Sequence, residues 1–282
     1  MKKIATIGCS FTWGQGLWYY HDTNEYVPTT YEYLHNVKKI PQSSLDFKDK
    51  NNWPGLVSSH FNTSYMMKSW NGGTDHESIQ FINTDVFDKN EDIEWLIFQT
   101  TQLYRSPFEF EVDGKKYIVK SEPDKENLAE INLLADGHYD GLHVPQKDFG
   151  KFFDWAHQNK INPAKFCEMN LLTVMDNIEN VLKKCEERGI KTAILCWTEE
   201  YLTEIIRRKF LTDRFIRLNY NGYEYSHIDD LQQKNPQLFI AKDTSKLHKS
   251  GDGFPSTDDW HPSLDCHKII ADNVINFIKE HE

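Results

Sequence analysis

The sequence predicts an α/β fold, as one domain around a mainly parallel sheet. Short apolar runs of strand length alternate along the chain with longer segments in which apolar residues recur every three or four positions. This alternation is typical of sheets that carry helices on their faces. The 282 residues are enough for one sizeable core, with length left over for insertions.

The predicted strands are short apolar runs. The first, Ile4 to Gly8, is stopped by its glycine. The others are "SYMMKSW", "IEWLIFQT", "KTAILCW" and "LFIAKD". Between them, helical spacing or a proline in a first turn predicts helices at 53–61, 76–87, 166–188, 199–210 and 263–280. Gly189 ends the longest of these helices.

Two stretches do not fit the alternation and are predicted to be insertions in a single domain that spans 1–282. Residues 19–52 are polar and aromatic without a clear period, which predicts an irregular excursion. Residues 106–165 contain "FEFEVDGKKYIVK", whose alternating residues around Asp113-Gly114 predict a hairpin. We expect part of one insertion to form a wall of the functional site, because both are too long for simple connections.

Composition excludes several classes of protein. The 32 basic and 43 acidic residues give a net charge of −11, which argues against nucleic acid or an acidic membrane surface as a partner. No run approaches the ~18 apolar residues of a membrane helix, and "IATIGC" is too short for a signal peptide. Five scattered cysteines without a CxxC pair fit reduced thiols, so a cytoplasmic protein is expected.

The stretch "GCSFTWGQG" follows the first predicted strand, where ligands of open α/β sheets collect. It lacks the lysine and spacing of a phosphate-binding P-loop, and its glycines do not fit G-x-G-x-x-G. Two interpretations of Ser10 remain at this point. The residue either caps the following helix or acts as a nucleophile.

The far end of the chain supplies residues that would complete such a nucleophile. "STDDWHPSLDCHKII" places Asp258 three residues before His261, just ahead of the last predicted helix. A turn there can direct both side chains to the strand end that carries Ser10, as a hydrolytic triad requires. Asp259 is the rival carboxylate, but the spacing favours Asp258. The alternative for His261 is an ordinary histidine in a surface turn.

Three blocks of the sequence resemble the SGNH, or GDSL-like, hydrolases. "IGCSFTWGQG" is similar to the first block of that family, "WNGGTDHESI" to the second and "STDDWHPS" to the final D-x-x-H-P block. The resemblance implies a three-layer α/β/α sandwich of flavodoxin-like type. It also implies a cofactor-free esterase in which Ser10 is the nucleophile, His261 the base and Asp258 its orienting partner.

The resemblance also implies an oxyanion hole, in which the backbone N–H groups of Ser10 and Gly73 are donors. The third block departs from the family pattern G-x-N-D, because "FQTTQLYR" follows the third predicted strand. Thr101 takes the place of the family's asparagine and Gln102 lies beside it, so one of the two is expected to be the third donor. Gly72 and Gly73 would also suit a simple tight turn.

Other candidate residues have competing interpretations. Arg105 and Trp260 are candidate substrate-binding residues, although Arg105 would equally pair with an acidic side chain. Asp75 and His76 are expected to be solvated loop residues. Cys9 is interpreted as a small packed residue, since a nucleophilic cysteine needs its own base. No metal site is expected, because the set Asp258, His261, Cys266 and His267 matches no zinc spacing.

The function predicted from these features is that of a serine esterase or deacylase acting on a small-molecule or carbohydrate ester, with an O-acetyl group on a sugar as one substrate class. The 8 tryptophans and 13 tyrosines suit stacking on sugar rings, but they suit a core equally well. Two alternatives remain open at this stage. One is a non-catalytic binding protein on the same fold, and the other is an acyltransferase that uses the same triad.

Overall fold

The structure is a computed structural model of the whole chain. It describes residues 2–21, 41–69, 73–88, 92–103, 107–112, 114–122, 132–133, 155, 157–160, 163–240 and 261–282.

A four-stranded parallel sheet forms the centre of the protein. Its strands are β1 (Lys3–Gly8), β2 (Tyr65–Ser69), β3 (Ile93–Gln99) and β7 (Lys191–Leu195), in the order β2-β1-β3-β7. The second strand in sequence, β2, therefore lies on one side of β1, and the third, β3, lies on the other. This is the start of a flavodoxin-like sheet, in which ligands bind where the strand order reverses, here between β1 and β3.

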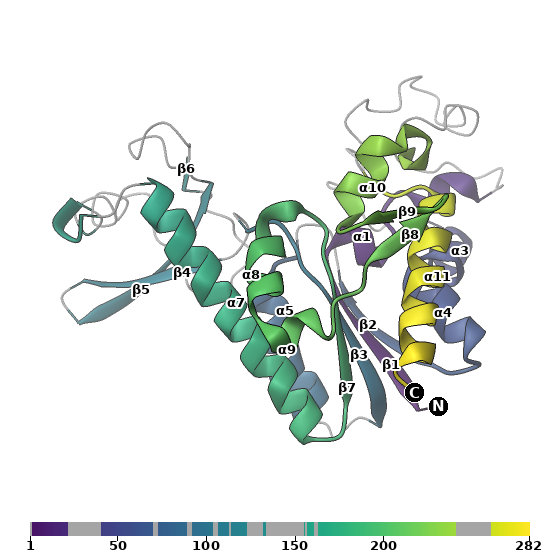
Figure 1. Cartoon of the computed structure of the whole chain (residues 1–282), viewed down its shortest axis with the longest axis horizontal. Helices are drawn as coiled ribbons and strands as arrows, with labels where there is room; N and C mark the ends of the chain where they lie inside the picture. The colour runs from purple at the N-terminus through teal and green to yellow at the C-terminus, as the bar shows by residue number, and fades with distance from the viewer. Residues whose placement is uncertain are drawn as a thin grey trace.

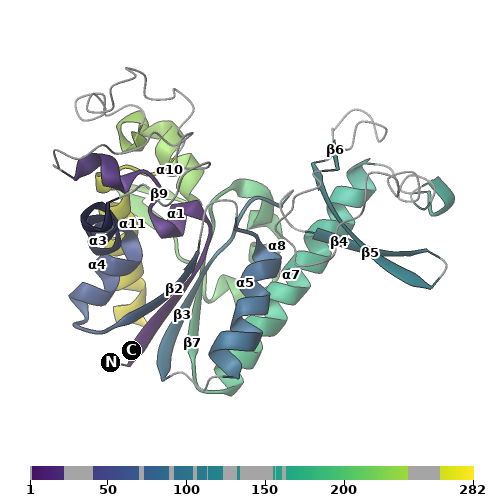
Figure 2. The same ribbon diagram turned by 180° about the vertical axis from the view of Figure 1, so that it is seen from behind.

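Helices cover both faces of this sheet, which gives the predicted three-layer α/β/α sandwich. Figures 1 and 2 show α4 (Trp53–His60) and α11 (Leu264–Glu280) on one face. They show α5 (Asp75–Phe81), α7 (Pro163–Glu187) and α8 (Leu202–Arg207) on the other. The prediction of the fold class is confirmed.

Alternation along the strands explains why two cores form. In β3, Trp95 and Ile97 join the core under α4 and α11, whereas Leu96 and Phe98 join the core under α5 and α7. Strands buried on both faces read as continuous apolar runs, which is the signal that "IEWLIFQT" carries.

A short segment after β7 extends the sheet further. Phe215 forms a parallel bridge with Ile194, and the N–H of Ile216 donates to the carbonyl of Ile194 at 2.9 Å. The chain then makes the hairpin β8 (Leu218–Tyr220) and β9 (Tyr223–Tyr225), followed by α10 (Ile228–Lys234). The hairpin turns at Asn221 and Gly222, both of which have positive φ.

The two predicted insertions contain regular structure. Residues 19–52 are not wholly irregular, because helix α3 (Gln42–Asn51) lies within them. Its buried residues include the polar Ser44 and Lys48, so the helix has no apolar period to recognise. The predicted hairpin is present as β4 (Pro107–Val112) and β5 (Lys115–Glu122), which pair up to Val112 and Lys115, and β6 (Asn132–Leu133) adds to it.

Two predicted elements differ from the structure near the end of the chain. The predicted helix 199–210 is divided into a 3-10 turn η7 (Glu199–Tyr201), α8 and α9 (Lys209–Thr212), because Arg208 has extended backbone angles. The predicted strand "LFIAKD" follows the 3-10 turn η8 (Pro236–Leu238) and forms only one bridge among the described residues, from Phe239 to Pro262. Its last three residues lie outside the described part.

The predicted end of α7 is confirmed, since Gly189 follows it with a φ of 79°. None of the described helices combines the length and apolar content needed to cross a bilayer.

Candidate active site

Ser10 lies directly beyond the carboxyl end of β1, as the first residue of the short helix α1 (Ser10–Trp13). The chain turns sharply here because Gly8 has no side chain. A Cβ atom on Gly8 would lie 2.3 Å from Oγ1 of Thr12 and 3.0 Å from Cβ of Gln99. The side chain of Ser10 is buried. The strand-to-helix turn therefore presents Ser10 at the edge of the sheet where α/β ligands bind.

His261 meets Ser10 from the opposite end of the sequence. Its Nε2 atom lies 2.8 Å from Ser10 Oγ, although 251 positions separate the two residues. For the serine hydroxyl to donate to Nε2, the imidazole proton must be on Nδ1. This distance agrees with the contact expected from the two terminal sequence blocks.

Hydrogen bonds hold the backbone on both sides of His261. The carbonyl of His261 accepts a hydrogen bond from the N–H of Ile240 at 3.0 Å, next to the bridge between Phe239 and Pro262. Ser263 then caps α11, accepting from the N–H of Cys266 at 3.3 Å. The histidine is therefore fixed between a bridge and a helix start, rather than placed on a free surface turn.

Aromatic packing also orients the imidazole. The ring of Phe11, beside Ser10, lies 5.1 Å from the His261 ring and 4.1 Å from the Trp197 ring, between centroids. Phe11 and Trp197 belong to the core under α11. The imidazole thus rests against Phe11, which is itself packed on Trp197, while its Nε2 faces the serine.

Several residues predicted for the site are not placed. Asp258, its rival Asp259, and the substrate-binding candidates Trp260 and Arg105 lie outside the described residues, as does Gly72. The described part of the site consists of the Ser10–His261 pair and the ends of the neighbouring strands.

The predicted oxyanion residues follow β2 and β3, the two strands that flank β1. Register pairs Gly8 with Ser69 of β2 and Ile7 with Phe98 of β3, so the three strands end at one level. Gly73 is buried, Thr101 is buried and Gln102 is half-buried. The loops that carry these candidate donors therefore begin at the strand ends next to Ser10.

The structure corrects the expectation for Asp75. It was predicted to be a solvated loop residue, but it is fully buried as the first residue of α5. Its Oδ1 accepts from the N–H of Thr101 at 2.9 Å and its Oδ2 accepts from the hydroxyl of Tyr201 at 2.6 Å. Burial raises the pKa of Asp75 to about 6, against these hydrogen bonds, which lower it. His76, the next residue, is half-buried.

The cysteines and His267 belong to the interior. Cys9 is buried and accepts a 3.4 Å hydrogen bond from Nε2 of Gln99, in agreement with a packed residue. Cys266 is buried, which raises the pKa of its thiol. His267 accepts from the N–H of Trp53 at 3.2 Å, and its burial lowers its pKa to about 3. Within the described ranges, no three His, Cys, Asp or Glu side chains lie together as a metal would require.

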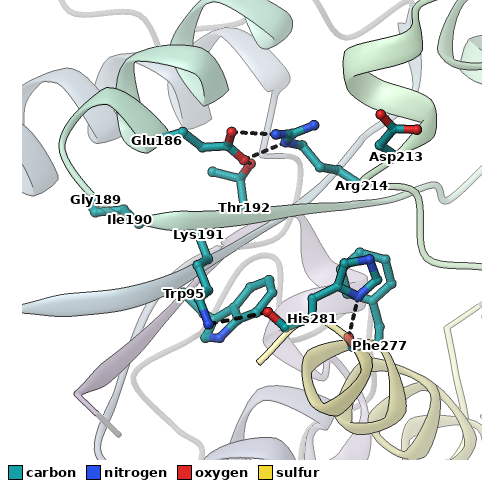
Figure 3. Close-up of a pocket in the computed structure, with 10 residues that line it drawn as sticks. All are labelled: Trp95, Glu186, Gly189, Ile190, Lys191, Thr192, Asp213, Arg214, Phe277 and His281. Atoms are coloured by element: carbon teal, nitrogen blue, oxygen red, sulfur yellow. Dashed lines mark hydrogen bonds and ion pairs between the residues drawn. The ribbon is translucent and has the colours of Figure 1, made fainter.

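A hollow of about 680 Å³ lies at the other end of the sheet (Figure 3). It is bordered by Lys191, at the start of β7, and by Phe277 and His281, near the end of α11. In it, Arg214 forms an ion pair with Glu186. Ligands of open α/β sheets bind at the carboxyl ends of the strands, so we assign the candidate site to Ser10 rather than to this hollow.

Comparisons with known proteins give matches among solved structures only. No family model matches the chain, and no curated protein matches its sequence. One similar structure is a protein from Desulfitobacterium hafniense DCB-2 assigned to the lipolytic G-D-S-L family (TM-score 0.41, 11% identity, 98% of each chain covered). A second is the psychrotrophic esterase EstA from Pseudoalteromonas sp. (TM-score 0.45, 8% identity, 99% of this chain and 97% of that chain).

A third similar structure is a catalytic mutant of an acetylxylan esterase from Geobacillus stearothermophilus (TM-score 0.38, 10% identity, 98% of this chain and 93% of that chain). The similar solved structures thus include esterases and a G-D-S-L protein. Because the identities are so low, no residue role and no substrate is transferred from them to this chain.

Sequence reasoning missed three residues that shape the site. Gln99 accepts a 2.6 Å hydrogen bond from Thr12 Oγ1 and so connects β3 to α1. The hydroxyl of Tyr201 donates to Asp75, which also accepts from the N–H of the candidate oxyanion residue Thr101. A polar residue at the end of an apolar strand, as at Gln99, was a signal for the first, but no local pattern pointed to the pairing of Asp75 with Tyr201.

Proposed function

We propose that this protein is a serine hydrolase that cleaves ester bonds, with Ser10 as the nucleophile and His261 as the general base. The observation that carries the proposal is the 2.8 Å contact between Ser10 Oγ and His261 Nε2 at the carboxyl end of β1. A serine is a weak nucleophile until an adjacent base takes its proton, and this contact supplies that base.

The reaction would run through an acyl-enzyme. His261 removes the hydroxyl proton as Ser10 Oγ attacks the ester carbonyl, and the imidazolium then returns that proton to the departing alcohol. Water next attacks the acyl-serine while His261 again acts as base, which releases the carboxylic acid and restores Ser10. In this scheme Asp258 holds Nδ1 of the imidazole and stabilises its charged form.

The oxyanion would be bound by backbone N–H groups of Ser10 and Gly73. The backbone N–H of Thr101 is already bonded to Asp75, so a third donor at this position must be the Thr101 hydroxyl or the Gln102 amide. Donors of this kind act in a site from which water is excluded, where each typically contributes about 10²–10³ in turnover.

The substrate would be a small O-acyl ester, and an O-acetyl group on a carbohydrate is the first class to test. Arg105 and Trp260 remain the proposed substrate-binding residues. No cofactor enters this chemistry, because serine, histidine and a carboxylate supply all the proton transfers.

A fluorophosphonate probe tests the nucleophile directly. We expect the wild-type protein to be labelled covalently, and we expect labelling to vanish in Ser10→Ala and to fall sharply in His261→Ala. Matched controls are Ser58→Ala, a buried serine that donates to the carbonyl of Gly55, and the exposed His60→Ala. Both controls should label like wild type, whereas equal labelling of Ser10→Ala would refute the proposal.

Activity is then measured with 4-nitrophenyl esters of graded chain length, followed by acetylated sugars. Hydrolysis that depends on Ser10 supports the esterase. Product formation that requires an added alcohol acceptor identifies an acyltransferase instead. Binding of an acetylated sugar without labelling or turnover identifies a non-catalytic binding protein.

A further inference from the structure

Asp75 connects three strand ends that are far apart in the sequence. It begins α5, two residues after Gly73, in the loop that follows β2. One carboxylate oxygen accepts from the N–H of Thr101, after β3, at 2.9 Å. The other accepts from the hydroxyl of Tyr201, in η7 after β7, at 2.6 Å. A single buried side chain therefore joins the two loops that carry the candidate oxyanion donors. It also links them to a third loop, the one that follows β7.

Helix capping does not explain this carboxylate. The N-terminus of α5 is already closed by a capping box, in which Thr74 Oγ1 accepts from the N–H of Glu77 at 3.1 Å. Glu77 completes the box by accepting from the N–H of Thr74 at 3.0 Å. The oxygens of Asp75 are directed instead to residues outside the helix.

The surroundings of Asp75 disfavour the ionised form of its carboxylate. Burial is the main influence on it, and the nearby carboxylate of Glu200 adds a like charge. The thiol of Cys196 also interacts with Asp75 electrostatically, and burial raises the pKa of that thiol to about 12, so it stays neutral. Tyr201 and Thr101 are the hydrogen-bonding partners among the described residues, and no cation is among the described groups that act on it. A buried charge without a cationic partner points to a role beyond packing.

We propose that Asp75 is a positioning residue for the oxyanion hole. It holds the loop of Gly73 and the loop of Thr101 at a fixed separation, with Tyr201 holding the carboxylate in place. The inference rests on the proposed function, since it assigns a task to that same site. It predicts that losing the acceptor that Asp75 offers to Thr101 lowers turnover without weakening substrate binding, because the donors act on the transition state.

The first test compares steady-state kinetics of variants with a 4-nitrophenyl ester. Asp75→Ala should lower kcat by about 30- to 100-fold with KM within about 2-fold, whereas Asp75→Asn, which still offers an acceptor to Thr101, should recover most of kcat. Tyr201→Phe should lower kcat by about 3- to 10-fold. Two controls keep the site intact: Glu77→Gln removes a charge from the capping box of the same helix, and Tyr225→Phe removes a hydroxyl that bonds only to Asn235 among the described residues.

The second test does not depend on activity. The amide proton of Thr101, followed by NMR, should titrate with a midpoint near the pKa of Asp75, about 6 in wild type. The midpoint should rise in Tyr201→Phe, because that donor favours the ionised carboxylate. The titration should be absent in Asp75→Asn, which also covers the case in which Asp75→Ala does not fold.

The outcomes separate the two proposals. If wild type neither hydrolyses esters nor is labelled at Ser10, the proposed function fails, and the positioning role falls with it even where the Thr101 amide titrates. If wild type is active but Asp75→Ala and Tyr201→Phe keep wild-type kcat, or if Asp75→Asn loses as much as Asp75→Ala, the positioning role alone is wrong. A Thr101 amide that ignores pH in active wild type would also overturn it.

Discussion

Oγ1 of Thr12 donates a 2.6 Å hydrogen bond to Oε1 of Gln99, and so closes the turn that presents Ser10. The bond crosses the space beside Gly8, where a methyl group would have to fit. The first helical turn after β1 and the end of β3 are thereby joined at the point where the strand order reverses.

Replacing Gly8 by alanine should destabilise the protein by about 1–3 kcal/mol, the usual cost of overpacking a filled interior. The new Cβ would lie 2.3 Å from Thr12 Oγ1, so Gly8→Ala with Thr12→Ala should recover part of that loss. Urea unfolding of the single and double variants measures both effects. Gly222→Ala is the control: it meets no atom within 4 Å and should cost only the ~1 kcal/mol of its left-handed backbone. Purely additive losses in the double variant would contradict the steric account.

The third donor of the proposed oxyanion hole can be identified by kinetics. Thr101→Val removes a buried hydroxyl at nearly constant volume, and Gln102→Ala removes a half-buried amide. We expect Thr101→Val to lower turnover by about 2.7–4 kcal/mol of transition-state stabilisation, with little change in KM. Thr100→Val, a buried threonine one position earlier in the chain, is the matched control. If both Thr101 and Gln102 variants keep wild-type turnover, backbone amides alone hold the oxyanion.

Asp75 should make the folded state less stable as pH rises from about 4 to about 6. Its folded pKa is raised from 3.8 to about 6, so the folded state binds more protons than the unfolded state in this window. Above pH 6 the contribution becomes constant, at a cost of roughly 3 kcal/mol. Asp75→Asn should remove this slope. Urea midpoints at pH 4.5 and pH 6.5 provide the measurement, and an unchanged slope in the variant would show that Asp75 is not the source.

His267 should have the opposite effect on how stability depends on pH. Its folded pKa is lowered from 6.5 to about 3 by burial, so the unfolded state binds more protons between these values and the free energy of unfolding falls as the pH drops below 6.5. His267→Asn offers Trp53 another acceptor but does not titrate, so it should flatten this loss. The exposed His60→Asn is the matched control for the loss of a histidine. Thermal or urea unfolding between pH 4 and pH 7 distinguishes the three proteins.

Sequence patterns predicted the parts of the fold that depend on local periodicity. The buried strands and the amphipathic helices α7 and α11 were legible because one face, or both, must be apolar. Helix α3 escaped prediction because Lys48 and Ser44 are among its buried residues, so polar groups occupy its interior positions. The β8–β9 hairpin was also missed, although its Asn221-Gly222 pair is the usual signal of such a turn.

Sequence motifs at the two ends of the chain were enough to predict that Ser10 and His261 would lie in contact. The site was not predictable where a tertiary contact decides the environment. Asp75 stands in a polar stretch that looks solvated, but it is buried where it meets Thr101, which follows β3, and Tyr201, which follows β7. No property of the residues beside it in the sequence reveals that pairing.

The wide sequence separation of Ser10 and His261 has a consequence for folding. During synthesis, the serine leaves the ribosome early, and its imidazole partner follows only after 250 further residues have been made. Contacts between such distant residues form late, since the intervening loop must first be closed at an entropic cost. With Ser10 as the proposed nucleophile, a partly made or partly folded chain would hold an unactivated serine, and labelling of Ser10 would report that the whole sheet and its last helix are in place.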